Sequence, residues 1–132
     1  MNKIKIIIAD DHSILREGLK TILSESDELQ VVAEAQNAAE AIQKARTIEA
    51  NVMLLDISLP DKNGIDALKV IKKDVPSLAV LMLSMHKEDQ YAIRALRAGA
   101  SGYVSKQSAS TELVQAIRLA SKGKKYLSAS VA

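Results

Sequence analysis

Cysteine is absent from this sequence, and aromatic residues are scarce: there are three tyrosines and no phenylalanine or tryptophan. Without cysteine the chain can form neither disulfides nor a thiolate metal site, which agrees with a reducing cytoplasm. A formal net charge of +2 and the lack of aromatics exclude the basic and aromatic patch that is typical of nucleic-acid binding. The apolar run nearest the N-terminus covers only residues 6–9, too short for a signal peptide or a membrane span.

The composition is that of one folded domain. The chain has 132 residues, of which 48% are hydrophobic, enough to bury a core but too few residues for a second complete domain. Short apolar segments that are typical of buried strands alternate with stretches of helical periodicity. The predicted strands cover residues 3–9, 31–33, 52–55, 78–83 and 102–105. Five strands alternating with five helices predict an α/β fold, with one parallel sheet covered by helices on both faces.

Several local signals mark the predicted helices. Ser13 is expected to cap the first helix, and Asn37 with Glu40 has the form of a capping box. Gly99 and Gly123 are expected to end the last two helices. In the first helix we expect one apolar stripe formed by Ile14, Leu15, Gly18, Leu19, Ile22 and Leu23.

Polar residues follow the predicted strands at the points where the strands end. Asp10 and Asp11 follow the first strand, Asp56 the third, Ser84 the fourth and Lys106 the fifth. Because the carboxyl ends of parallel strands meet at one edge, which is where such sheets bind ligands, we expect these side chains to form a site. Pro60 and Gly64 bracket the loop that follows Asp56.

The predicted site has a clear chemical logic. Three carboxylates within about 4 Å would repel by about 4 kcal/mol per pair at an effective dielectric constant near 20, so a cation must offset them. Mg²⁺ prefers oxygen ligands, and Lys106 would supply further positive charge. A carboxylate such as Asp56 can attack phosphorus to form an aspartyl phosphate, and the Ser84 hydroxyl can hydrogen-bond its phosphoryl oxygen. His12 and His86 have no partner at metal-ligand spacing, so we do not expect a zinc site.

With these residues the chain resembles a receiver domain of bacterial two-component response regulators. The resemblance rests on Asp10, Asp11, Asp56 in DISLP, Ser84, Tyr103 and Lys106. The opening ADDHSILREGL and the later AGASGYVSK are most similar to the NarL/FixJ (LuxR-type) subgroup. The resemblance implies a doubly wound, flavodoxin-like sheet of order 2-1-3-4-5. It also implies a receiver domain over residues 1–123, with residues 124–132 starting a linker toward a C-terminal domain that this chain does not contain.

The resemblance also implies a function, a cytoplasmic phosphorylation-dependent signalling switch. A sensor histidine kinase phosphorylates Asp56, and Asp10, Asp11, Asp56 and the Ser58 carbonyl hold Mg²⁺. The chain catalyses at most its own phosphorylation and dephosphorylation. Ser84 and Tyr103 form the switch, in which Tyr103 turns inward on phosphorylation and a homodimer can form. The output is transcription through a helix-turn-helix domain, so DNA is contacted only by that absent domain and no membrane is involved.

Two other functions share parts of this pattern. A haloacid dehalogenase-type phosphohydrolase also uses a nucleophilic aspartate and Mg²⁺, but that family has a second aspartate two residues later, where this chain has Ser58. A receiver-like interaction module that never takes phosphate would be expected to lack one of the acidic residues or Lys106.

Overall fold

The computed structural model describes residues 3–84, 89–106 and 109–127. Its core is a parallel sheet of order β2-β1-β3-β4-β5-β6. The strands are β1 (Ile4–Ala9), β2 (Leu29–Ala35), β3 (Val52–Asp56), β4 (Ala79–Ser84), β5 (Gly102–Ser105) and β6 (Tyr126–Leu127). The predicted order 2-1-3-4-5 is therefore confirmed, and β6 is a further short strand that the sequence patterns did not indicate.

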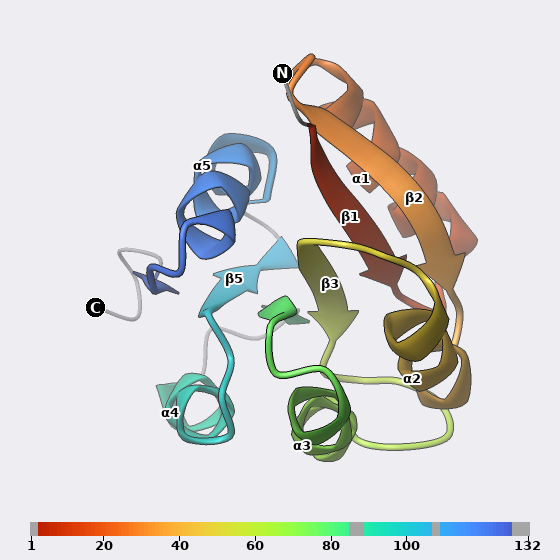
Figure 1. Ribbon diagram of the computed structural model, residues 1–132, viewed down its shortest axis with the longest axis vertical. Coiled ribbons are helices and arrows are strands. Elements are labelled where there is room, and N and C mark those ends of the chain that lie inside the picture. The colour runs from red at the N-terminus through yellow and green to blue at the C-terminus, as the bar shows by residue number, and fades with distance from the viewer. Residues whose placement is uncertain (1–2, 85–88, 107–108, 128–132) are drawn as a thin grey trace.

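In the described part of the chain, five helices cover the two faces of the sheet. They are α1 (Ser13–Ser24), α2 (Ala38–Thr47), α3 (Gly64–Asp74), α4 (Asp89–Arg97) and α5 (Ala109–Ser121). In Figure 1, α1 and α5 lie on one side of the sheet, and α2, α3 and α4 lie on the other. This is the predicted arrangement of a doubly wound α/β domain.

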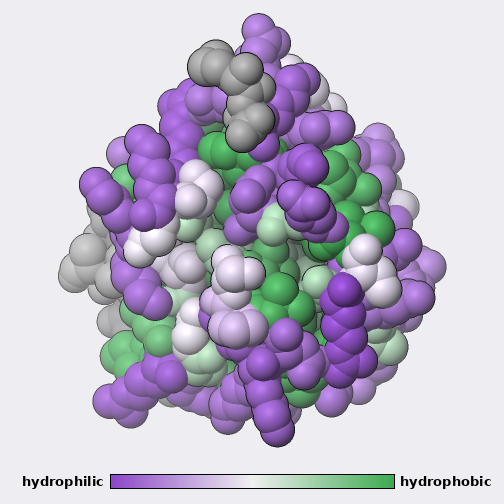
Figure 2. All heavy atoms as spheres, viewed as in Figure 1, coloured by the Kyte–Doolittle hydropathy of each residue, from purple (hydrophilic) through white to green (hydrophobic). Residues whose placement is uncertain are grey.

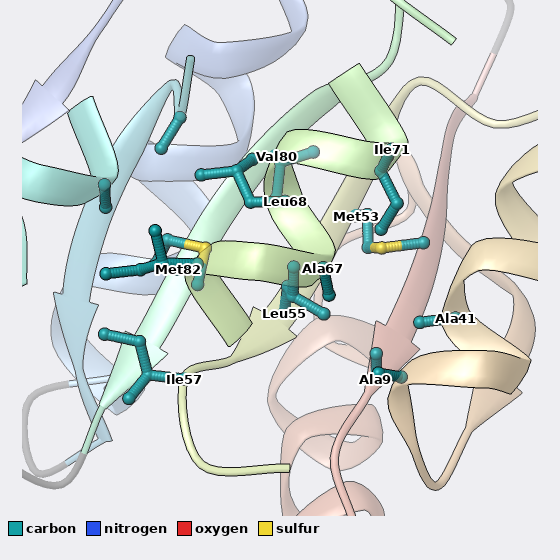
Figure 3. Packing of buried hydrophobic residues seen from close by; sticks show 14 of the residues in the cluster. Ala9, Ala41, Met53, Leu55, Ile57, Ala67, Leu68, Ile71, Val80 and Met82 are labelled. Carbon is teal, nitrogen blue, oxygen red and sulfur yellow. The ribbon is translucent and has the colours of Figure 1, made fainter. Parts of the chain in front are cut away.

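The sheet buries a separate hydrophobic cluster on each face. On one face, Met53 and Met82 of the central strands pack with Leu68 and Ile71 of α3 (Figure 3). On the other face, residues such as Leu54 face α1 and α5. Every residue of β3 is buried, which explains why its sequence is a continuous apolar run rather than an alternating one.

The first helix differs from its prediction in two respects. Ser13 is the first helical residue rather than the cap, and His12 occupies the N-cap position with no side-chain capping bond. Gly18, expected in the apolar stripe, is exposed, and Ile14, expected in the same stripe, is 87% exposed. At about 100° per residue it lies about 140° around the helix from Leu19, which is buried, so Ile14 belongs to the solvent face.

The ends of the last two helices agree with prediction. Gly99 and Gly123 have φ of 107° and 80°, a left-handed conformation that favours glycine. Beyond Gly123, the backbone N–H of Tyr126 donates a 2.8 Å hydrogen bond to Ser101, so the chain continues along the edge of β5.

The surface is mainly polar. On the face shown in Figure 2, hydrophilic side chains dominate the outline, and hydrophobic residues show between them nearer the middle. Among the described residues, no helix has the length and apolar character that a membrane crossing requires.

Candidate functional site

The strand ends bring the predicted site residues to one edge of the sheet. Asp56 is the last residue of β3 and Ser84 the last of β4, while Asp10 directly follows β1 and Lys106 directly follows β5. Asp10, Asp56 and Ser84 are each no more than 1% exposed. These polar side chains lie in the interior because the hydrophobic strands that carry them are themselves buried.

Lys106 connects the acids at the ends of two neighbouring strands, β1 and β3. Its Nζ lies 3.0 Å from Oδ2 of Asp56 and 2.9 Å from Oδ2 of Asp10. Burial alone would lower the pKa of Lys106, but hydrogen bonding and charge from Asp10 and Asp56 outweigh that effect and raise the pKa above the ordinary lysine value. Lys106 is therefore a fixed cation at the site.

The two carboxylate oxygens of Asp56 have different partners. Oδ1 accepts a 3.0 Å hydrogen bond from the Ser58 backbone N–H, and Oδ2 accepts one from Lys106. Burial raises the pKa of the Asp56 carboxyl, while Ser58 and Lys106 oppose that shift. The negative charge of Asp10 adds to the effect of burial, so Ser58 and Lys106 do not fully offset the rise in the Asp56 pKa.

A compact acidic cluster surrounds Asp56. One ligand atom from each of Asp10, Asp11, His12 and Asp56 lies within 4.8 Å of all the others. Among the described residues, Oδ1 of Asp11 is buried and accepts no hydrogen bond, while Oδ2 of Asp10 lies 2.9 Å from Nζ of Lys106. Carboxylate oxygens gathered from several residues are what a hard divalent cation such as Mg²⁺ requires, so these residues fit the predicted metal.

His12 is the member of this cluster that sequence reasoning missed. Its Nδ1 lies 3.3 Å from Oδ1 of Asp10 and 3.1 Å from Oδ1 of Asp11. The spacing of histidines along the chain carries no sign of this. The available signal was its position directly after Asp11, at the end of the same strand.

The loop after Asp56 is held by close packing and by hydrogen bonds. A Cβ on Gly64 would lie 2.4 Å from the backbone oxygen of Asp56, so only glycine lets α3 start so close to the site. Asp61 accepts hydrogen bonds from the backbone N–H groups of Ala38 at 2.7 Å and Ala39 at 3.0 Å. The loop therefore caps the start of α2 as well as leading into α3.

The remaining predicted residues lie where the sequence suggested. Ser58 is exposed and pairs with Asn63 across the loop. Ser84 is paired in register with Ser105 of β5. Tyr103 is 0% exposed, so its side chain is buried without a phosphoryl group on Asp56.

Comparisons with known proteins agree with this geometry. Residues 6–118 match the family described as response regulator receiver domain. The chain is 36% identical over 129 residues to the response regulator GacA of Pseudomonas syringae pathovar syringae, with 98% of this chain and 60% of GacA covered. It is 43% identical over 114 residues to the transcriptional regulatory protein LnrK of Bacillus subtilis, with 86% of this chain and 52% of LnrK covered.

A solved structure supports the same assignment. The crystal structure of a two-component response regulator of the LuxR family from an Aurantimonas species superposes with a TM-score of 0.94 at 35% identity. That match covers 98% of this chain and 93% of the solved one. The chain thus spans 60% of the length of GacA but nearly all of the solved LuxR-family chain. From its fold and from these matches, this chain belongs to the family of response regulator receiver domains.

Proposed function

We propose that Asp56 receives a phosphoryl group from a sensor histidine kinase and that this modification sets the signalling state of the domain. The observation that carries the proposal is the environment of its carboxylate, which is buried at a strand end, accepts hydrogen bonds from Ser58 and Lys106, and adjoins Asp10 and Asp11. Such a group is placed for nucleophilic attack on phosphorus next to fixed positive charge.

The transfer is an in-line substitution at phosphorus. One carboxylate oxygen of Asp56 forms a bond to phosphorus while the bond from phosphorus to the kinase histidine breaks, and its electron pair returns to the imidazole. Lys106 offsets negative charge on the transferring group, and the Ser84 hydroxyl and Ser58 N–H are donors for phosphoryl oxygens.

Asp10, Asp11, Asp56 and the backbone carbonyl of Ser58 are the residues that would hold Mg²⁺. The bound ion would supply positive charge that offsets the phosphoryl oxygens. Asp11→Ala should weaken Mg²⁺ binding in a calorimetric titration, whereas Glu49→Ala, which changes a 92% exposed side chain, should not. Equal affinities in the two variants would contradict this ligand assignment.

The test of the acceptor is the intact mass of the chain after incubation with Mg²⁺ and acetyl phosphate. The wild type and Asp66→Asn should gain one phosphoryl group, since Asp66 is an exposed acid in the first turn of α3. Asp56→Asn should gain none while remaining folded by circular dichroism. A phosphoryl group on Asp56→Asn protein would contradict the proposal.

The output that we propose for this receiver is transcription. LnrK is a transcriptional regulatory protein roughly twice as long as its match to this chain. We therefore propose that this receiver acts in the cytoplasm and controls transcription through a helix-turn-helix domain, with homodimer formation on phosphorylation. Sedimentation of the chain with and without phosphorylation tests the dimer. The phosphohydrolase alternative has no support, since Ser58 stands where its second aspartate would be.

A further inference from the structure

We propose that His12 is a nitrogen ligand of the metal site, so that this receiver binds nitrogen-preferring transition-metal ions in addition to Mg²⁺. The inference rests on the proposed function, because it concerns the same site, and it adds the chemical class of cation that the site selects. Its basis is the position of the His12 imidazole relative to Asp10 and Asp11.

The distances within the cluster match those between neighbouring ligands of one ion. Around an octahedral ion with bonds of about 2.1 Å, adjacent ligand atoms are about 3 Å apart. Nδ1 of His12 lies 3.1 Å from Oδ1 of Asp11 and 3.3 Å from Oδ1 of Asp10. Each carboxylate oxygen therefore lies at about the distance from this ring nitrogen that neighbouring ligands of one ion would have.

The hydrogen-bonding state of the oxygens points to a cation. Among the described residues, Oδ1 of Asp11 accepts no hydrogen bond although Nδ1 of His12 is close to it. Asp10 has a fully buried side chain, and its Oδ2 already faces the Lys106 ammonium at 2.9 Å. A buried carboxylate oxygen without a donor, such as Oδ1 of Asp11, is placed to face a positive centre.

The local backbone places His12 next to Asp10, and the ring Nδ1 lies within hydrogen-bond distance of Oδ1 of Asp10. The His12 N–H donates a 2.8 Å hydrogen bond to Oδ1 of Asp10, which fixes the turn between β1 and α1. As the N-cap residue of α1, His12 makes no side-chain capping bond, so its ring is not needed by the helix. The ring is 67% exposed, which leaves it accessible to an ion entering from solvent.

A nitrogen ligand changes which ions bind well. Carboxylates, carbonyls and water suit Mg²⁺, whereas imidazole suits later first-row ions such as Co²⁺, Ni²⁺ and Zn²⁺. Mg²⁺ keeps several waters, so it can occupy the site with water in place of the imidazole. The affinity for Co²⁺ should therefore depend on His12, and the affinity for Mg²⁺ should not.

The test compares Mg²⁺ and Co²⁺ binding to the wild-type chain, His12→Gln and His86→Gln by calorimetry. His86 is the second of the two histidines in the sequence, so its variant controls for the loss of any imidazole. His12→Gln should weaken Co²⁺ binding about tenfold or more and change Mg²⁺ binding less than about threefold. His86→Gln should change neither. In proton NMR, Co²⁺ should produce strongly shifted imidazole signals in the wild type that are missing in His12→Gln.

The outcomes separate this inference from the proposed function. The ligand role of His12 would be overturned if His12→Gln left the Co²⁺ affinity unchanged, or if it weakened the Mg²⁺ and Co²⁺ affinities equally. Either result would leave the phosphoryl site intact. Loss of Co²⁺ binding in His86→Gln instead would overturn the ligand role of His12 as well. Failure of the wild type to bind Mg²⁺ would contradict the proposed function itself.

Discussion

Lys106 Nζ lies 3.0 Å from Oδ2 of Asp56, a contact between two side chains that are 50 residues apart in the sequence. Both groups are buried, and the same amino group also pairs with Asp10. One lysine therefore offsets two interior carboxylates. This arrangement leaves the site short of positive charge and makes its stability depend on what else binds there.

Replacing Lys106 tests this charge balance. Lys106→Met should lower the free energy of unfolding by about 3 kcal/mol at neutral pH without metal, because two buried carboxylates lose their cation. Added Mg²⁺ should restore part of the loss. Urea unfolding with and without Mg²⁺ measures both effects. Lys69→Met, at an exposed position of α3, is the matched control, and a loss no larger than that of the control would argue against the pairing.

Replacing Gly64 tests the close approach of α3 to Asp56, and replacing Gly18 in α1 provides the contrast. In Gly64→Ala the new Cβ would lie 2.4 Å from the Asp56 backbone oxygen and 2.6 Å from Cα of Ile57. The backbone must shift, so we expect destabilisation of about 1–3 kcal/mol and weaker Mg²⁺ binding. Gly18→Ala, on the exposed side of α1 with no atom within 4 Å, should instead stabilise by about 0.5–1 kcal/mol. Chemical denaturation measures the free energy of unfolding of both variants. A change of the same sign in the two would contradict this account.

The bond between Asp61 and the start of α2 predicts a pH dependence. Hydrogen bonds from the N–H groups of Ala38 and Ala39 lower the pKa of Asp61, with a smaller opposing effect of burial. An acid with a lowered folded-state pKa adds stability above its unfolded pKa, near 4, and loses it as the pH falls through the folded value.

Asp61→Asn should therefore be less stable than the wild type at neutral pH, and the difference should shrink as the pH falls below about 4. Thermal unfolding over this pH range provides the comparison. Asp27→Asn, at an exposed loop position, is the control. A difference that does not vary with pH would mean that the charge of Asp61 is not what holds α2.

Ser84 is expected to couple the phosphoryl group on Asp56 to Tyr103 of β5 and to α4. Ser84→Ala should still accept phosphate on Asp56 but should respond weakly to it. Converting a ten-to-one inactive ensemble to ten-to-one active needs about 2.8 kcal/mol, which two or three charge-assisted hydrogen bonds can supply. NMR shifts of Tyr103 and of α4, measured with and without a phosphate mimic, report the response.

The starting position of Tyr103 is part of the same test. Because Tyr103 is already buried in β5, the expected change is in its contacts rather than a passage from solvent. Equal responses in wild-type and Ser84→Ala proteins would show that Ser84 is not the coupling residue.

The strand ends could be predicted from the sequence. Each buried strand is a run of apolar residues, and the runs stop at the first polar residue, which is Asp10, Asp56 or Ser84. In a parallel sheet all these ends share one edge, so the convergence of the acids with Lys106 needed no tertiary information.

Features that depend on contacts between distant segments could not be predicted. Asp61 caps a helix that begins 23 residues earlier, a pairing that no local spacing reveals. Gly64 has the appearance of a turn residue, but the structure needs it for close packing against Asp56. The short β6 has only two residues, too few for a recognisable strand pattern.

Errors in the first helix came from local reasoning. The stripe predicted for α1 included Ile14, although its angular position places it on the solvent face. His12 was not expected at a metal site because the sequence shows no partner for it at metal-ligand spacing, and the fold brings its ring within 4.8 Å of ligand atoms of Asp10, Asp11 and Asp56.

The phosphoryl acceptor is the central claim, and locating the modified residue tests it most directly. The chain would be incubated with acetyl phosphate, with or without Mg²⁺, and then treated with borohydride, which reduces an acyl phosphate to an alcohol that survives peptide mapping. We predict homoserine at position 56 alone, and only when Mg²⁺ is present. Reduction at another acid, or none at position 56 in folded protein supplied with Mg²⁺, would contradict the account.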